Sequence, residues 1–275
     1  MGECTLAIVG GGNMASAILA GCARSGDPEL APRRMVVAEP DGARRAGLAA
    51  LGAEVVASAG ELGRWLGPST QVLLAVKPQS LASAASDLDG LVSGRVVISI
   101  LAGTASATVR SAVGADARVV RAMPNLAAGI GQGVTAVAVG SGAAEADAAL
   151  AERLFGAVGP LVVRIDESLM DAFTAVAGSG PAYVFYLAEA MVRAAVATGF
   201  TAEQADAVVR QTIVGAGALL RGDARSAAEL RGAVTSRGGT TQAAIAVLDG
   251  RDVAGAIESA VVAARDRGRE LGVNA

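Results

Sequence analysis

A glycine-rich turn lies directly after the first apolar run of the chain and directly before an amphipathic stretch. Its sequence, Gly10-Gly11-Gly12-Asn13-Met14-Ala15, fits the pattern G-x-G-x-x-A. Between a strand and a helix, such glycines permit a tight turn and a close approach of the backbone to a pyrophosphate, and the small residue lets helix and strand pack. The free N–H groups of the helix start attract an anion. The turn therefore predicts dinucleotide binding; the alternative is a purely structural glycine turn.

The first half of the chain alternates short apolar runs with alanine-rich amphipathic stretches, which is typical of strand-helix units around a parallel sheet. The predicted strands are Thr5–Gly10, Met35–Glu39, Gln71–Lys77, Arg95–Ile100, Arg118–Ala122, Val134–Val139 and Leu161–Ile165. Beyond residue 165 only helical periodicity continues, with a capping box at Thr201-Ala-Glu-Gln204. We expect an α/β dinucleotide-binding domain over residues 1–165 and an all-α domain over residues 166–275.

Further candidate contacts to the dinucleotide follow the next predicted strands. Glu39 ends the second strand, where an acidic side chain can accept a hydrogen bond from the ribose 2′-hydroxyl of NADH. Arg44 and Arg45 can instead pair with the 2′-phosphate of NADPH, so the preference stays undecided. Ala75-Val76-Lys77-Pro78 ends the third strand, at the sheet edge where ligands bind. Lys77 is the only lysine of the chain, which favours a functional ammonium over a chance surface residue.

The chain contains no histidine, which excludes Ser-His-Asp and Cys-His catalysis within it and zinc sites with histidine ligands. Charges nearly balance, at 23 Lys+Arg against 26 Asp+Glu, so we expect no nucleic-acid partner and no membrane association. Hydrophobic residues make up 52% of the chain, which we attribute to a large subunit interface. The isolated Cys4 and Cys22, and an N-terminus without a visible targeting segment, lead us to expect a cytoplasmic protein.

A second loop rich in glycine and hydroxyl groups lies in the helical half. Val234-Thr-Ser-Arg-Gly-Gly-Thr-Thr-Gln242 precedes an apolar helix predicted at Ala243–Leu248. Hydroxyls, amides and a helix N-terminus together suit a small anion such as a carboxylate; the alternative is that Thr240 or Thr241 merely caps the helix. Without imidazole, a redox substrate must need little proton transfer from the protein. A cyclic imine with a carboxylate meets both conditions, because its protonated iminium carbon accepts hydride directly.

Taken together, these motifs resemble the pyrroline-5-carboxylate reductases, enzymes that make proline. The resemblance spans essentially the whole chain and is carried by Val9-Gly-Gly-Gly-Asn-Met-Ala15, Ala75-Val-Lys-Pro78, Val120-Arg-Ala-Met-Pro-Asn125, Gly178-Ser-Gly-Pro-Ala-Tyr183 and Thr235-Ser-Arg-Gly-Gly-Thr-Thr241. It implies reduction of 1-pyrroline-5-carboxylate to L-proline with NADPH or NADH. It also implies an N-terminal Rossmann domain and a helical C-terminal domain that forms a homodimer, often built into a decamer, and no metal.

The resemblance implies roles for residues of both loops. Thr241 would hydrogen-bond the substrate nitrogen and donate a proton, and we take Thr241 and Lys77 as candidate catalytic residues. The amides of Gly239 and Thr240 would hold the substrate carboxylate. The candidate substrate-binding residues are Ser236, Gly238, Gly239, Thr240 and Thr241. The candidate cofactor-binding residues are Val9, Gly10, Gly11, Gly12, Asn13, Met14, Glu39, Ala75, Val76, Lys77 and Pro78.

The chain departs from the family pattern at three places. Arg237 stands where proline is usual, Leu126 and Ala127 stand where Thr-Pro is common, and Ser226-Ala227 stands near the place of a His-Pro pair. These departures leave the substrate range open. One alternative hypothesis is a reductase of another cyclic imine, or a hydroxy-acid dehydrogenase with Lys77 as general base. Another is a non-catalytic dinucleotide sensor, which would have no use for a substrate loop.

Overall fold

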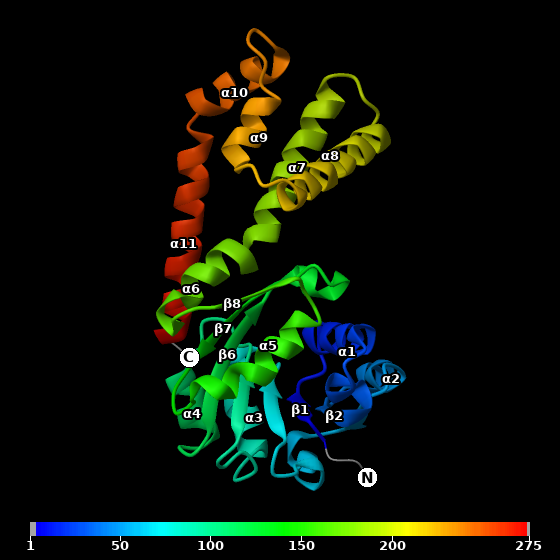
Figure 1. The fold of residues 1–275 in the computed structure, drawn as a ribbon, viewed down its shortest axis with the longest axis vertical. Helices are drawn as coiled ribbons and strands as arrows, with labels where there is room; N and C mark the ends of the chain where they lie inside the picture. Colours follow the sequence, from blue (N-terminus) through cyan, green and yellow to red (C-terminus); the bar gives the residue numbers. More distant parts are fainter. Residues whose placement is uncertain (1–3, 274–275) are drawn as a thin grey trace. The chain divides into compact units, whose positions relative to one another are not determined.

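The computed structural model describes residues 4–273 (Figure 1), so residues 1–3 of the segment considered for targeting lie outside the described residues. The strands are β1 (Leu6–Val9), β2 (Met35–Ala38), β3 (Glu54–Val56), β4 (Gln71–Leu74), β5 (Val96–Ser99), β6 (Arg118–Pro124), β7 (Val134–Val139) and β8 (Leu161–Arg164). The α-helices are α1 (Asn13–Ser25), α2 (Gly42–Ala50), α3 (Leu81–Asp87), α4 (Ser106–Val113), α5 (Ala149–Gly156), α6 (Met170–Phe173), α7 (Gly180–Ala197), α8 (Ala202–Gly222), α9 (Ala227–Ala233), α10 (Thr240–Gly250) and α11 (Val253–Val273).

The eight strands form one sheet in the order β3-β2-β1-β4-β5-β6-β7-β8. The first six are parallel, and their order is that of a Rossmann dinucleotide-binding fold. The expectation of a wholly parallel sheet is wrong for β7, which pairs antiparallel with β6. Only residues 125–133 separate these two strands, which is too short for the crossover that a parallel pair requires.

All seven predicted strands are present, and most are shorter than expected. The strand β4 ends at Leu74, so Ala75-Val76-Lys77-Pro78 lies in the loop that follows it. The strand β3 was not predicted; it has three residues and begins with the exposed Glu54. A strand this short carries no recognisable alternation of apolar and polar side chains.

Alternate residues of the strands face the two sides of the sheet, and each side has its own core. Leu6 and Ile8 of β1 pack in the cluster that includes side chains of α1, α2 and α5. Ala7 and Val9 pack in the cluster that includes side chains of α3 and α4. A strand that is apolar on both faces is what a sheet covered by helices on both sides requires.

Both cysteines are buried, free thiols, Cys22 in the first of these clusters and Cys4 in the second. Burial raises the pKa of Cys22 to about 12, chiefly because the charged thiolate is poorly solvated there. The thiol therefore stays protonated near neutral pH. The prediction that both cysteines are small core residues is confirmed.

The chain divides into two compact units. One comprises the described residues up to Ser179 and from Ala263 onward, and the other comprises Gly180–Val262. The sheet ends with β8, close to the boundary expected at residue 165, but the first compact unit continues further. Met170 belongs to a small core with Ala136 and Ala138 of β7, which ties α6 to the sheet. A π-helical turn, Thr174–Gly178, then follows.

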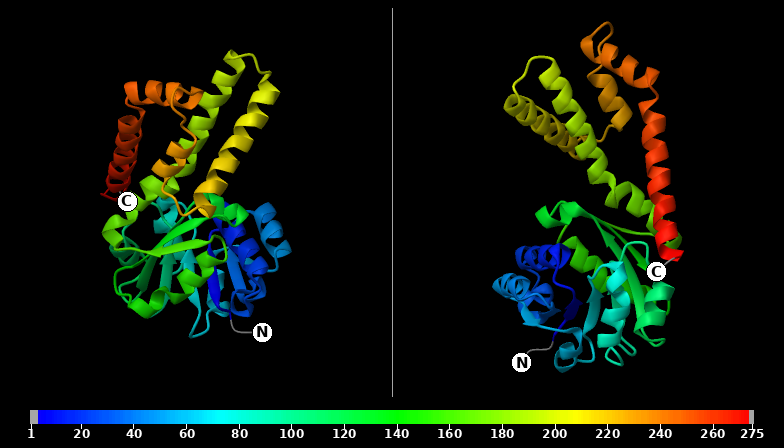
Figure 2. Two further views of the ribbon diagram at one scale, coloured as in Figure 1. Left: turned by 45° about the horizontal axis from the view of Figure 1, so that its top comes forward. Right: turned by 180° about the vertical axis from the view of Figure 1, so that it is seen from behind.

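The second unit is wholly helical, as expected for this part of the chain. The helices α7 and α8 run side by side in both views of Figure 2. The predicted capping box starts α8, because the Thr201 hydroxyl accepts from the Gln204 N–H at 3.2 Å and the Gln204 Oε1 accepts from the Thr201 N–H at 3.1 Å. Large apolar side chains of this unit are exposed, among them Phe185, Tyr186, Leu187, Val214 and Leu219.

An exposed apolar surface of this extent marks an interaction site rather than an ordinary protein surface. Across residues 4–273, none of the helices combines the length and the apolar character needed to span a membrane.

Candidate active site

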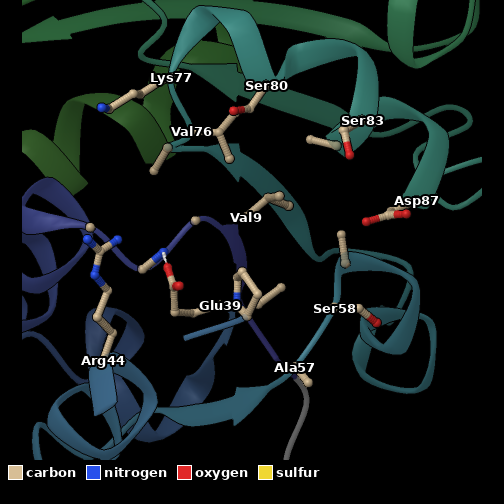
Figure 3. Close-up of a pocket in the computed structure, with 18 residues that line it drawn as sticks. Val9, Glu39, Arg44, Ala57, Ser58, Val76, Lys77, Ser80, Ser83 and Asp87 are labelled. Atoms are coloured by element: carbon tan, nitrogen blue, oxygen red, sulfur yellow. Dashed lines mark hydrogen bonds between the residues drawn. The ribbon is translucent and has the colours of Figure 1, made fainter. Parts of the chain in front are cut away.

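A cavity of about 590 Å³ opens at the carboxyl ends of β1, β2, β3 and β4 (Figure 3). The order of the strands reverses between β1 and β4, and ligands of open α/β sheets bind in the crevice at such a point. We call this cavity the sheet-edge pocket. Of the candidate cofactor-binding residues, those that line it are Val9, Gly10, Gly11, Gly12, Glu39, Ala75, Val76 and Lys77.

Two glycines of the first loop are required by the fold itself. Gly10 has a φ of +99°, and a Cβ atom there would lie 2.7 Å from the carbonyl oxygen of Ala75. At Gly11 a Cβ atom would lie 2.5 Å from Leu48 Cδ1 and 2.8 Å from Glu39 Cβ. Distances this short are sterically forbidden, so larger residues at either position would displace the neighbouring loop or side chains.

Gly12 differs from its two neighbours, because no atom lies within 4 Å of the position that a Cβ atom would take there. Its φ of −74° is open to any residue. The helix α1 begins directly after it, and no described side chain caps the N–H groups of its first turn. The missing Cβ leaves space beside these N–H groups, and the residues present therefore fit a dinucleotide pyrophosphate.

The Glu39 side chain is fixed at the end of β2. The residue is only 5% exposed, its Oε2 accepts from the Gly11 N–H at 2.8 Å, and its Oε1 accepts from the Asp41 N–H at 2.9 Å. Arg45 donates to the carbonyl oxygens of Glu39 and Pro40, at 2.8 and 2.7 Å. The arginine that lines the pocket is Arg44.

Asp41, whose N–H donates to Glu39, also caps the helix α2. Its Oδ1 accepts from the Arg44 N–H at 2.9 Å, and this hydrogen bond is the main reason why the pKa of Asp41 lies below its usual value. A second carboxylate, ionised at neutral pH, therefore lies in the loop that carries Glu39.

The remaining candidate residues of this half lie at the margins of the pocket. Lys77 lines it with an exposed side chain that has no ion pair within residues 4–273, and Figure 3 shows it on the opposite side of the view from Asp87. Asn13 and Met14 open α1, and Pro78 opens a short 3-10 helix; none of these three is among the lining residues.

Several lining residues were not expected from the sequence. Ala57 and Ser58 follow the missed strand β3. Ser80 directly precedes α3, and Ser83 and Asp87 lie within it. Recognising β3 in the sequence would have predicted Ala57 and Ser58 at the pocket, since the ends of parallel strands share one edge of the sheet.

The candidate substrate loop lies in the second unit and forms a tight turn before α10. Gly238 has a φ of +72°, its N–H donates to Gln242 Oε1 at 2.5 Å, and the Gly239 N–H donates to the Ser236 carbonyl at 3.0 Å. Gly239 is the residue that precedes the helix, and α10 starts at Thr240 rather than at the expected Ala243. The hypothesis that Thr240 or Thr241 serves only as a helix cap is therefore wrong.

The donors of Thr240 and Thr241 are available to a ligand, whereas the N–H groups of Gly238 and Gly239 already donate within the turn. No side chain of the described residues caps α10, and within residues 4–273 the hydroxyls of Thr240 and Thr241 have no hydrogen-bond partner. Free N–H groups of a first helical turn together with hydroxyls suit an anionic group. In the same part of the chain, no three side chains of His, Cys, Asp and Glu gather into a group that could hold a metal ion.

Asn125 connects two segments of the first unit that are far apart in the sequence. Asn125, which ends the motif that runs along β6, donates from Nδ2 to the Ala177 carbonyl at 3.2 Å and accepts at Oδ1 from the Val134 N–H at 3.3 Å. The asparagine thus links the π-helical turn to the start of β7. Leu126, directly after it, is 66% exposed.

Comparisons with known proteins cover nearly the whole chain. Residues 167–271 match the family model described as "Pyrroline-5-carboxylate reductase dimerisation", and residues 5–103 match "NADP oxidoreductase coenzyme F420-dependent". A pyrroline-5-carboxylate reductase of Synechocystis is 39% identical over 97% of this chain and 98% of its own length. One from Pisum sativum is 34% identical over 97% of this chain and 96% of its own length.

Solved structures agree with the sequence relatives. A pyrroline-5-carboxylate reductase from Coxiella burnetii is similar with a TM-score of 0.88 and 30% identity, over 98% of this chain and 99% of that one. The enzyme of Plasmodium falciparum, solved with NADP bound, is similar with a TM-score of 0.83 and 25% identity, over 98% of this chain and 100% of that one. The chain therefore belongs to the pyrroline-5-carboxylate reductase family.

Proposed function

We propose that this chain reduces 1-pyrroline-5-carboxylate to L-proline with NADPH or NADH. The chain belongs to the pyrroline-5-carboxylate reductase family, and the observation that carries the proposal is its sheet-edge pocket. In this pocket Gly12 leaves free space beside the uncapped start of α1. When bound, the dihydronicotinamide supplies the hydride that adds to the imine carbon. The ring nitrogen keeps its proton, so the reaction fits a protein that has no imidazole.

The dinucleotide is assigned to the first loop and to the ends of the neighbouring strands. The pyrophosphate is assigned to Gly10-Gly11-Gly12 and to the N–H groups of Asn13 and Met14. Glu39 is assigned to the adenosine ribose, and Ala75-Val76-Lys77-Pro78, together with Val9, to the edge of the cofactor. The support for this assignment is that eight of these residues line one cavity.

The substrate is assigned to the loop before α10. The amides of Gly239 and Thr240 hold the carboxylate, with the Gly239 N–H leaving or sharing its bond to the Ser236 carbonyl, and Ser236 and Gly238 shape the turn. The Thr241 hydroxyl hydrogen-bonds the ring nitrogen and donates a proton to the neutral amine that hydride transfer produces, and water restores that proton. The support is that the donors of Thr240 and Thr241 have no partner among the described residues. We also propose a catalytic role for Lys77, which lines the pocket with an exposed side chain and has no ion pair within residues 4–273.

The two predicted domains have different roles. Residues 1–165 bind the cofactor, and residues 166–275 carry the substrate loop and the subunit contacts. The match to a dimerisation family over residues 167–271 and the exposed apolar side chains of α7 and α8 support a homodimer. We further propose that dimers assemble into a decamer, that the protein is cytoplasmic, and that it has no nucleic-acid or membrane partner. The two free cysteines support a reducing compartment.

The test is to mix the purified protein with NADH or NADPH and add 1-pyrroline-5-carboxylate. We expect the dihydronicotinamide absorbance to fall only after the imine is added, with one proline formed per nucleotide consumed. The six-membered cyclic imine carboxylate and a set of β-hydroxy acids with the oxidised nucleotides serve as competitors. Faster turnover of either competitor, or no turnover with both nucleotides, would overturn the proposal.

A further inference from the structure

The proposed function leaves open which nicotinamide nucleotide the pocket takes. We propose that Glu39 makes the sheet-edge pocket selective for NADH over NADPH. This inference rests on the dinucleotide-binding part of the proposed function and goes beyond it. It concerns one end of the pocket, where β2 ends and where the adenosine ribose of a Rossmann fold lies.

The first observation is the number of acceptor sites that Glu39 still offers. Its two oxygens accept from the N–H groups of Gly11 and Asp41, at 2.8 and 2.9 Å. A carboxylate has about four lone-pair sites, so each oxygen retains one. The side chain lines the pocket, and these remaining sites can accept from the vicinal hydroxyls of an unphosphorylated ribose.

The second observation is that the Glu39 carboxylate cannot withdraw. Its stem lies against the glycine loop, because a Cβ atom on Gly11 would be 2.8 Å from Glu39 Cβ and 2.9 Å from Glu39 Cγ. The residue is 5% exposed, and two backbone N–H groups fix its head. A 2′-phosphate placed on the same ribose would meet a negative charge that is held in place, and a like charge of this kind is an effective means of rejecting a ligand.

The third observation concerns the two arginines that follow in sequence. Arg45 donates to the carbonyl oxygens of Glu39 and Pro40. Arg44 is therefore the arginine left to face a phosphate, and Figure 3 shows its side chain beside the glycine loop on the same side of the view as Glu39. Arg44 and Glu39 both line this end of the pocket, whereas Asp41 is not among the lining residues and its charge is opposed by both Arg44 and Arg45. A phosphate monoester brings about 1.5 to 2 further negative charges at neutral pH, and the Glu39 carboxylate that lines this end of the pocket repels them.

The experiment compares two ligands that contain only the adenine half of the cofactor, ADP-ribose and 2′-phospho-ADP-ribose. Their binding to the purified full chain is measured by calorimetry, without substrate and without turnover. We expect ADP-ribose to bind about ten- to a hundredfold more tightly, since hydrogen bonds to a charged group contribute about 1.5–3 kcal/mol and 1.4 kcal/mol is tenfold.

Variants assign the effect to individual side chains. We expect Glu39→Gln to reduce the preference about tenfold or more, because it removes the charge and keeps the size. We expect Arg44→Ala to weaken only the 2′-phosphorylated ligand. Arg33→Ala is the matched control, since it removes the same charge from an exposed position outside the pocket lining, and we expect it to leave the ratio of the two affinities unchanged.

The outcomes separate this inference from the proposed function. Equal or tighter binding of 2′-phospho-ADP-ribose by the unmodified chain would overturn the selectivity assigned to Glu39 and leave the reductase proposal standing. An unchanged preference in a folded Glu39→Gln variant would also overturn it. If neither ligand and neither full nucleotide bound, both the inference and the dinucleotide assignment would be wrong.

Discussion

Gly10 and Ala75 lie so close together that a Cβ atom on Gly10 would be 2.7 Å from the Ala75 carbonyl oxygen. The loop after β1 is thus packed directly against the loop after β4. Two residues further along, the Cβ position of Gly12 has no atom within 4 Å. The same loop therefore contains a glycine that the fold requires and a glycine that only a ligand would require.

This contrast predicts opposite effects of two identical substitutions. We expect Gly10→Ala to destabilise the protein by about 1–3 kcal/mol, because it combines a forbidden contact with a positive φ. We expect Gly12→Ala to change the free energy of unfolding by less than about 1 kcal/mol and to weaken dinucleotide binding at least about tenfold, since the methyl group takes up the space beside the start of α1. Denaturant titration and nucleotide titration of both variants measure the two effects. A Gly12→Ala variant that binds nucleotide as the unmodified chain does would contradict the placement of the pyrophosphate.

The second prediction concerns the proton donor proposed in the substrate loop. We expect Thr241→Ala to lower kcat strongly, by about a hundredfold, while the affinity for the dinucleotide stays within a few-fold. Thr212→Ala is a suitable control, because this exposed threonine of α8 donates its hydroxyl to the Val208 carbonyl at 2.8 Å and belongs to neither loop. Steady-state kinetics and nucleotide titration separate the two roles. Loss of nucleotide binding in Thr241→Ala would show that the loop was assigned to the wrong ligand.

The third prediction concerns the apolar surface of the second unit. Phe185 is 55% exposed and lines a groove of about 750 Å³ along α7 and α8, together with Val184 and Ile213. We expect Phe185→Glu to raise the dissociation constant of the dimer at least about tenfold, because burying an unpaired carboxylate in an apolar interface is costly. Analytical ultracentrifugation measures the change. Ala50→Glu, at an exposed position of α2, introduces the same charge and should leave the mass unchanged. An unchanged dimer in Phe185→Glu would place the subunit contact elsewhere.

The fourth prediction concerns an ion pair outside both loops. Glu167 accepts from the Ser106 N–H at 2.7 Å and from its hydroxyl at 2.5 Å, and lies 3.4 Å from the guanidinium of Arg121, which is 6% exposed. Burial lowers the pKa of Arg121, and the carboxylates of Glu167 and Asp171 oppose this shift. Removing Glu167 leaves both the first turn of α4 and the buried cation without their main partner.

We therefore expect Glu167→Ala to destabilise the protein by about 2–4 kcal/mol. Glu61→Ala serves as the control, since it breaks an exposed pair with Arg64 and should cost less than about 0.5 kcal/mol. Thermal and denaturant unfolding compare the two variants. Equal, small effects would mean that the buried pair contributes no more than a surface pair.

The sequence predicted the features that depend on neighbouring residues. The turn at Gly10-Gly11-Gly12 was found because strand, glycines and helix follow one another directly, and the capping box at Thr201 was found for the same reason. The direction of β7 was missed, because the apolar pattern of a strand is the same in both directions. The strand β3 was missed because three residues are too few for a pattern, and Ser58 of the pocket was missed with it.

The chemistry of the adenosine end could not be predicted from sequence. Glu39, Arg44 and Arg45 are near neighbours in the chain, and each of them could have faced a ribose or a phosphate. Only the fold shows that Arg45 donates to backbone carbonyls and that Gly11 and Asp41 hold the carboxylate of Glu39. Likewise, the residue that precedes α10 is Gly239 rather than Thr240 or Thr241. A sequence pattern does not locate a helix start to within one residue.

The transfer of hydride from the nucleotide to the ring carbon is tested most directly with an isotope. The reduced nucleotide that the protein turns over faster, carrying deuterium in both positions at C4 of the nicotinamide ring, is incubated with the purified protein and 1-pyrroline-5-carboxylate, and the proline formed is analysed by mass spectrometry and NMR. We expect proline with one deuterium, located at C5, in an amount equal to the nucleotide consumed. Proline without deuterium, or nucleotide oxidation without proline, would contradict the function proposed for this chain.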